Sequence, residues 1–90
     1  MNINHLNELP NPIKDELFDY IYTSFSDGKD RHTAYGLKQR FTRLHPNKDF
    51  HVTSSCFMEA MVSMGYEAIP IPGLKEPDWS FHLKVLYPEP

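Results

Sequence analysis

The sequence predicts an α+β fold in which three helices are followed by a β-hairpin. Two observations lead to this prediction. Apolar residues recur at helical spacing in three segments before Gly65, and after Tyr66 apolar residues alternate with polar ones, as they do in half-buried strands. The 90 residues, of which 40% are hydrophobic and 13% aromatic, suffice for one small core, so we expect a single domain.

The N-terminal part of the chain is expected to contain an arm and the first helix. Residues 1–10 lack periodicity and end beside prolines, so we expect a flexible arm before a domain spanning residues 11–90. Asn11 is a good N-cap and Pro12 suits the first helical position. Asp27 and Gly28 are expected to end this helix, and residues 28–32 to form a polar loop. The apolar stripe of this first helix includes Ile13, Leu17, Tyr20 and Ile21.

Two further helices are expected between residues 33 and 65. Thr33 is expected to cap the second helix, which must end before Pro46. A short extended segment, residues 50–52, follows a turn, and Gly65 is the expected end of the third helix. The inward stripe of the second helix is Ala34, Leu37, Phe41 and Leu44. The third helix has three candidate N-caps, Thr53, Ser54 and Ser55.

The C-terminal part of the chain reads as a hairpin. Residues 67–71 look like a short strand, which two prolines confine to a sheet edge. The alternation from Trp79 to Tyr87 is the strongest strand pattern in the chain. A helix-turn-helix unit over residues 33–65, preceded by a helix and followed by a hairpin, is the order expected of a winged-helix domain, with a minor strand between helices two and three.

Charge is segregated along the chain, although the net charge is only −3. Residues 1–27 and 49–90 each carry a net charge of −4, whereas residues 31–48 carry five basic residues and no acid. The basic segment is either an anion-binding surface or is paired with the protein's own acids. Its basic residues are Arg31, Lys38, Arg40, Arg43 and Lys48.

The expected outward face of the third helix contains no lysine or arginine. It consists of Ser55, Met58, Glu59, Val62 and Ser63. A recognition helix reads DNA bases with polar and basic side chains in the major groove, so direct base reading by this face is not expected. Exposed Met58 and Val62 suit a contact with another protein or a homodimer, unless both pack against the hairpin or the N-terminal arm.

We therefore predict a small, non-enzymatic protein-interaction module. The alternative is a weak DNA-binding regulator, which would rely on salt-dependent phosphate contacts from the basic segment and the hairpin. Candidate residues for that alternative are Lys38, Arg40, Arg43, Lys48 and Lys84.

Catalytic and metal-binding patterns are weak. The spacing of His45, His51 and Cys56 matches no zinc pattern, so solvated or core-edge histidines are expected. Cys56 at a helix start would suit a nucleophile, but a small buried cysteine is the commoner case and no oriented His–Asp pair accompanies it. We expect no catalytic residue, no metal, no cofactor and no small-molecule substrate. The single cysteine, the polar start and the lack of a long apolar run predict a cytoplasmic protein.

The segment from residue 33 to residue 83 resembles small winged-helix-like proteins of bacteriophages and mobile elements. Those proteins show a T-x-Y-x-L-K pattern, then F-x-x-A-M-x-x-x-G-Y, then W-x-F. Most of the matching positions are core or cap residues, so the resemblance implies a shared fold and an accessory or host-directed role, and no particular chemistry. The matching residues are Thr33, Tyr35, Leu37, Lys38, Phe57, Ala60, Met61, Gly65, Tyr66, Trp79 and Phe81.

Overall fold

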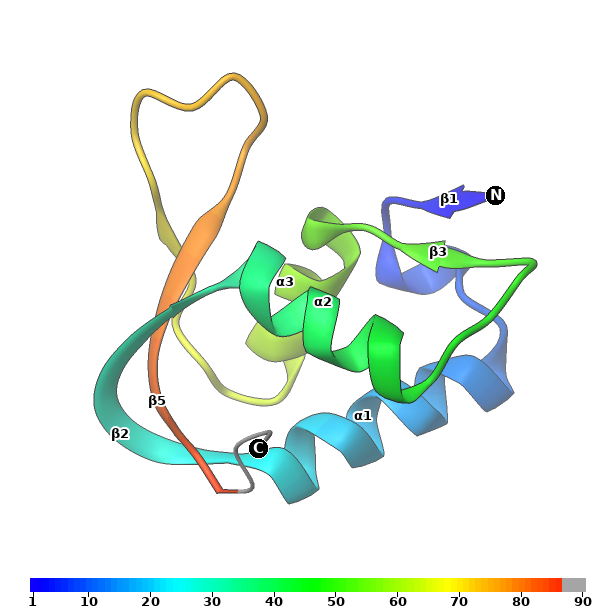
Figure 1. The fold of residues 1–90 in the computed structure, drawn as a ribbon, viewed down its shortest axis with the longest axis horizontal. Coiled ribbons are helices and arrows are strands. Elements are labelled where there is room, and N and C mark those ends of the chain that lie inside the picture. Colours follow the sequence, from blue (N-terminus) through cyan, green and yellow to red (C-terminus); the bar gives the residue numbers. More distant parts are fainter. Residues whose placement is uncertain (87–90) are drawn as a thin grey trace.

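Residues 1–86 are described by the computed structural model, in which three α-helices pack beside a three-stranded sheet (Figure 1). The predicted α+β class is confirmed. The helices are α1 (Asn11–Ser24), α2 (Ala34–Leu44) and α3 (Ser54–Ser63), with a 3-10 turn, η1 (Leu6–Glu8), before them. The strands are β1 (Asn2–Ile3), β2 (Phe25–Thr33), β3 (His51–Val52), β4 (Ile69–Pro70) and β5 (Trp79–Val85).

The starts of α2 and α3 are set by threonine caps. The Thr33 hydroxyl accepts a hydrogen bond from the backbone N–H of Gly36 at 3.0 Å, and the Thr53 hydroxyl accepts one from Cys56 at 3.3 Å. Each cap satisfies a backbone donor that has no partner within its helix. The end of α2 at residue 44 agrees with the restriction that Pro46 places on the residue before it.

The other helix boundaries show one agreement and two differences. One difference is that α1 ends at Ser24 and not at Asp27 and Gly28, which belong to β2. At the end of α3, Gly65 has a φ of +96°, and the backbone N–H of Tyr66 donates to the carbonyl of Met61 at 3.0 Å. This left-handed stop is the one expected from the sequence. At the start of α1, however, Pro10 occupies the N-cap position and Asn11 is already helical.

The order of the elements differs from the predicted α-α-(β)-α-β-β order. Residues 28–32 were expected to be a loop, yet they belong to the nine-residue strand β2, which pairs antiparallel with β5. Apart from Phe25 the strand buries no side chain, so it lacks the alternation that marks a strand in a sequence. Its conformation depends on backbone pairing with β5, interrupted by a bulge between Asp27 and Asp30.

Strand β5 is the centre of the three-stranded sheet, whose order is β2-β5-β4. Phe81 and Leu83 are fully buried, while Trp79 and Val85 at the strand ends are half-buried. The expected alternation is therefore confirmed from Phe81 to Val85, whereas Ser80, expected to face outward, is only 3% exposed. The last expected member of the alternation, Tyr87, lies outside the described residues. The edge position expected for the proline-flanked strand is also confirmed, because β4 pairs on one side only.

The first ten residues do not form the separate arm that the sequence suggests. Strand β1 pairs in parallel with β3, which places Ile3 opposite Val52 (Figure 1). Ile3 and Leu9 are 2% and 3% exposed and belong to the core. Burial of the large apolar side chains of Ile3 and Leu9 in the core is favourable. Because both residues are held in the core, the polar residues between them also lie against the domain.

The core lies between the helices and the inward face of β5. One residue of the predicted α2 stripe is misplaced, because Leu44 is 57% exposed. The ring of His45 stacks on Phe41 with 5.0 Å between ring centres and meets the edge of Tyr20 of α1, so His45 and not Leu44 makes the inward contact at this end of α2. The largest fully buried side chains are Phe57, Phe81, Ile3, Leu17, Ile21, Leu37, Met61, Leu83 and Cys56.

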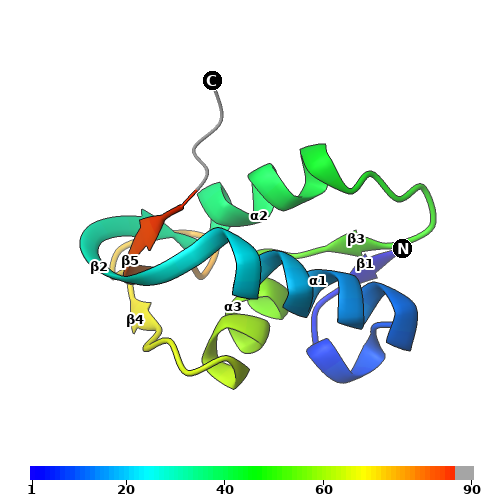
Figure 2. The ribbon, with the colours of Figure 1, turned by 90° about the horizontal axis from the view of Figure 1, so that it is seen from below.

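The segregation of charge along the chain becomes a segregation in space. In Figure 2, α2 lies on one side of the molecule, and α1 and α3 lie toward the other. α2 carries basic residues and no acid, whereas the exposed side of α1 carries Asp15, Glu16 and Asp19. No helix within residues 1–86 combines the length and the apolar character that crossing a bilayer requires.

The close approach of β2 and β5 at Gly28 predicts that a side chain at this position destabilises the folded state. A Cβ atom at this position would lie 2.7 Å from the backbone N of Lys84 and 2.8 Å from the carbonyl C of Leu83. We expect Gly28→Ala to lower the free energy of unfolding by about 1–3 kcal/mol, because the two strands must move apart. Urea unfolding followed by circular dichroism measures this change.

The matched control is Gly36→Ala in α2. There the nearest atom to a new Cβ is the Thr33 hydroxyl at 3.2 Å, and alanine favours a helix by roughly 1 kcal/mol over glycine. Its unfolding free energy should stay within about 1 kcal/mol of the parent value. Equal losses for both variants would contradict the close approach of the two strands.

Candidate functional site

The outward face of α3 is the strongest candidate site, and the structure brings most of its predicted residues together. Met58, Glu59, Val62 and Ser63 line one hollow of about 560 Å³ on the surface. Val62 is 49% exposed, whereas Met58 is half-buried and packs against the core. Ser55 does not reach this hollow and lines a different one, beside the β4–β5 loop. Four of the five predicted residues therefore form one surface.

The opposite wall of the hollow includes the N-terminal segment, which was the alternative packing partner considered for Met58 and Val62, and also α1, which was not expected there. It is formed by the N-terminal segment and α1, with residues His5, Leu6, Asn7 and Lys14. These residues enter the site because η1 packs on α3. One local signal was present: Glu8 follows His5 by three residues, and its carboxylate accepts the His5 backbone N–H at 3.0 Å, which is the capping-box pattern.

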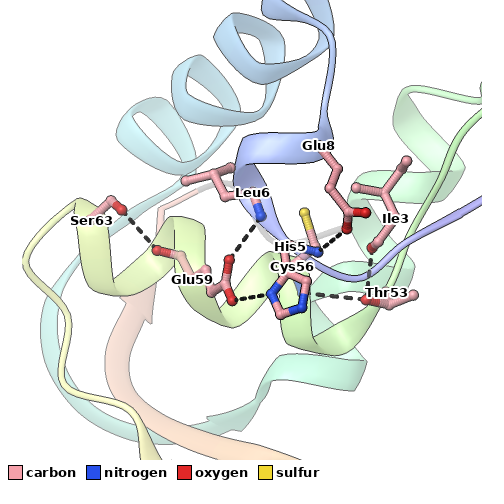
Figure 3. Close-up of polar contacts among 8 residues, drawn as sticks. All are labelled: Ile3, His5, Leu6, Glu8, Thr53, Cys56, Glu59 and Ser63. Atoms are coloured by element: carbon pink, nitrogen blue, oxygen red, sulfur yellow. Dashed lines mark hydrogen bonds and ion pairs between the residues drawn. The ribbon is translucent and has the colours of Figure 1, made fainter.

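Glu59 connects the two walls of the hollow (Figure 3). One carboxylate oxygen accepts the backbone N–H of Leu6 at 2.8 Å, and the other lies 3.0 Å from Nδ1 of His5. The hydrogen bond from the Leu6 backbone and the pairing with His5 lower the pKa of Glu59. The hydrogen bond between His5 and Glu59, together with the negative charge of Glu59, raises the pKa of His5. Glu59 therefore binds the chain's own N-terminal segment.

The first turn of α3 provides a second attachment for this segment. Both the backbone N–H and the hydroxyl of Thr53 donate to the carbonyl oxygen of Ile3, at 3.1 and 2.8 Å (Figure 3). The same hydroxyl caps α3 through Cys56. The N-terminal segment is thus bound at the start of α3, through Thr53, and in the middle of it, through Glu59, which gives the hollow a defined wall.

Cys56 lies behind this face and is unsuited to nucleophilic chemistry. Its side chain is fully buried, and burial, followed by the charges of Glu59 and Glu8, raises the pKa of the thiol to about 11. The reactive thiolate is therefore scarce near neutral pH. Among residues 1–86, no three His, Cys, Asp or Glu side chains converge in a way that could hold a metal ion.

The basic residues proposed for DNA contacts do not form one surface. Lys38 is only 5% exposed, because its stem is buried and its ammonium lies 4.7 Å from the ring centre of Tyr35. Arg40 and Arg43 lie on the other flank of α2. Lys48 belongs to the α2–β3 loop and Lys84 to the end of β5, two regions on opposite sides of the molecule in Figure 1.

Internal pairing does not neutralise the basic segment. Within the described part of the chain, Arg40, Lys48 and Lys84 form no salt bridge, whereas two histidines pair with glutamates. One of these pairs joins His45, at the end of α2, to Glu16 of α1. Positive charge on α2 is therefore exposed to solvent at some positions.

Comparison with models of protein families, with curated proteins and with solved structures finds no match for this chain. The resemblance to winged-helix-like proteins of bacteriophages accordingly stays a prediction, and the function is argued from the site.

The pair between His5 and Glu59 predicts a pH-dependent contribution to stability. The folded state raises the pKa of His5, so its stabilisation is complete below the unfolded value of about 6.5 and is lost as the pH rises through the folded pKa. The folded state lowers the pKa of Glu59, so its stabilisation is present above about 4.5 and is lost as the pH falls through the folded pKa.

The contribution of the pair should therefore be largest between about pH 4.5 and 6.5. Thermal unfolding of the parent protein and of His5→Gln should differ most in this window and least at pH 8. His82→Gln, which changes an exposed histidine on β5, is the matched control. A His5→Gln effect that is the same at pH 5.5 and pH 8 would show that the pair does not form.

Proposed function

We propose that this chain is a small, non-enzymatic winged-helix-like module that binds a protein through the outward face of α3. The winged-helix part of the proposal is supported by the succession of α2 and α3 with a short strand between them, and by the β4–β5 hairpin that follows. The interaction part rests mainly on one observation. An apolar side chain, Val62, stands half-exposed at a hollow of about 560 Å³.

The composition of this face favours a protein over DNA. α3 contains no lysine or arginine, and its one charged residue, Glu59, is engaged by the N-terminal segment. The β4–β5 loop would be the wing, and it carries Glu76 and Asp78 against Lys75. Asp78 is also used internally, because its carboxylate accepts the backbone N–H groups of Tyr35 and Trp79 at 3.2 and 2.8 Å. A phosphate backbone would meet little positive charge here.

The cellular role follows from the sequence patterns. The resemblance of residues 33–83 to small proteins of bacteriophages and mobile elements supports an accessory or host-directed factor that acts in the cytoplasm. A buried, reduced Cys56 is consistent with that compartment. In such a role a protein contact is sufficient, and no cofactor is required.

The second candidate function is weak DNA binding through the α2 side. The observation that favours it is the positive charge of Arg40 and Lys48, on α2 and in the loop that follows it, which no salt bridge neutralises among the described residues. The burial of Lys38 weighs against it, because it removes one of the five expected phosphate contacts.

The interaction proposal predicts a specific loss of binding in Val62→Glu. Burying a carboxylate in an apolar contact costs several kcal/mol, so capture of a partner from a bacterial lysate should fall at least about tenfold. The fold should persist, because Val62 is 49% exposed. The matched control is Leu74→Glu, which changes a 51% exposed residue in the β4–β5 loop and should leave capture unchanged. Equal capture by both variants would place the contact elsewhere.

The DNA-binding candidate predicts a steep dependence on salt. A protein with three or four phosphate contacts should lose affinity by roughly one to two orders of magnitude between 50 and 200 mM salt. Fluorescence anisotropy with a labelled duplex measures this, and Arg40→Ala with Lys48→Ala should flatten the slope by about two units on the logarithmic plot. An affinity insensitive to salt, or no binding at 20 mM salt, would eliminate this candidate.

A further inference from the structure

Lys38 is the only charged side chain that is buried among residues 1–86, and its ammonium group has no hydrogen-bond acceptor there. It is 5% exposed and forms no salt bridge within this part of the chain. The ammonium lies 4.7 Å from the ring centre of Tyr35, but a ring face does not replace the acceptors that its three N–H donors require. Burying an ammonium without acceptors costs free energy. An anion beside Lys38 would remove this cost.

The ammonium of Lys38 lies beside the segment that joins β3 to α3. Figure 1 shows β3 beside α2 and leading into α3. Burial, followed by the positive charge of Lys38, lowers the pKa of His51 in β3, so the two side chains are close together. Tyr35, over which the ammonium lies, lines a hollow of about 390 Å³ together with Ser54, the first residue of α3. These contacts place the ammonium at the start of α3.

The first turn of α3 supplies further donors at this place. Thr53 already accepts the backbone N–H groups of Cys56, through its hydroxyl, and of Phe57, through its carbonyl. The N–H groups of Ser54 and Ser55 have no acceptor among the described residues, and both serines line a hollow beside the β4–β5 loop. The positive end of a ten-residue helix therefore lies beside a buried ammonium. Like charges this close repel each other, and one anion between them would satisfy both.

An anion that enters the hollow also meets charges of the β4–β5 loop. No side-chain nitrogen or oxygen among residues 1–86 is both sealed from solvent and unbonded, so the ammonium of Lys38 keeps an opening to solvent. Lys75, Glu76 and Asp78 of the loop line the hollow. The Asp78 carboxylate is engaged, because it accepts two backbone N–H groups, one of them in α2. Glu76 opposes an anion and Lys75 attracts one, so Lys38 and the start of α3 leave the balance positive.

We propose that Lys38 and the first turn of α3 form a binding site for a terminal phosphate group, such as that of a phosphate monoester. The ammonium and the N–H groups of Ser54 and Ser55 donate to its oxygens, and the hydroxyls of both serines belong to the same turn. A terminal phosphate has three free oxygens and can enter end-on. The phosphodiester of a nucleic acid cannot, because Lys38 is recessed. This site is separate from the outward face of α3, so the inference goes beyond the proposed function.

Thermal unfolding in inorganic phosphate tests the proposal, with sodium chloride of the same ionic strength as the reference. A ligand that binds only the folded state raises the Tm. We expect about 100 mM phosphate near pH 7.5 to raise the Tm of the parent protein by at least about 5 °C, whereas dimethyl phosphate, a diester, should leave it unchanged. No rise in phosphate would overturn the site, and an equal rise in both compounds would overturn the assignment to a terminal phosphate.

Two lysine variants separate a built site from general ion effects. Lys38→Met keeps the length of the side chain and removes its charge, so the phosphate-dependent rise in Tm should vanish. In chloride this variant should unfold at the parent temperature or above it, because the unpaired buried charge is gone. The matched control is Lys29→Met, which changes an exposed lysine in β2 and should keep the full rise. An equal rise in Lys38→Met and in the parent would mean an adventitious ion only.

Amide chemical shifts locate the anion even if Lys38→Met fails to fold. Titrating the parent protein with inorganic phosphate should move the amide signals of Ser54 and Ser55 most. Glu76→Gln should lower the dissociation constant for phosphate about two- to fivefold, because it removes the opposing charge. Largest shifts elsewhere, for example at residues 58–63, or a weaker affinity in Glu76→Gln, would overturn the site at the start of α3.

Discussion

The docking of the N-terminal segment on α3 is the contact on which the candidate site depends. Glu59 accepts the backbone N–H of Leu6 and pairs with His5, while Thr53 binds the carbonyl of Ile3. These contacts turn an exposed helix face into one wall of a hollow. They also occupy the only charged side chain that α3 could offer to a ligand, and what remains available on this face is mainly apolar.

In the proposed function, the surface formed by α3 therefore serves a protein contact in place of base reading. The two sides of the molecule differ in charge: α2 is basic and α1 is acidic, and α3 lies on the side of α1. Base reading requires positive and polar groups on the helix that enters the groove. In this chain the positive charge lies on the preceding helix, α2. Part of this charge belongs to Lys38, whose side chain is buried and whose ammonium lies over the ring of Tyr35.

The sequence predicted the elements whose apolar residues recur in a regular pattern, and missed those without such a pattern. α2, α3 and β5 were predictable because helical or alternating patterns follow from one buried side, and Thr33 and Gly65 mark boundaries by local chemistry. β2 was missed because it is held by backbone pairing and exposes polar side chains. Likewise the α3 wall of the hollow was predictable from helical spacing. The position of His5 in the opposite wall depends on its contact with Glu59, which lies more than fifty positions away in the sequence.

Amide hydrogen exchange of the free and the partner-bound protein would test most directly whether the outward face of α3 is the contact surface. Exchange reports local opening, and a bound partner slows it where the contact forms. The account predicts added protection in peptides that cover residues 5–7 and 58–63, with none in the β4–β5 loop. Protection confined to α2 or to residues 71–78 would contradict it.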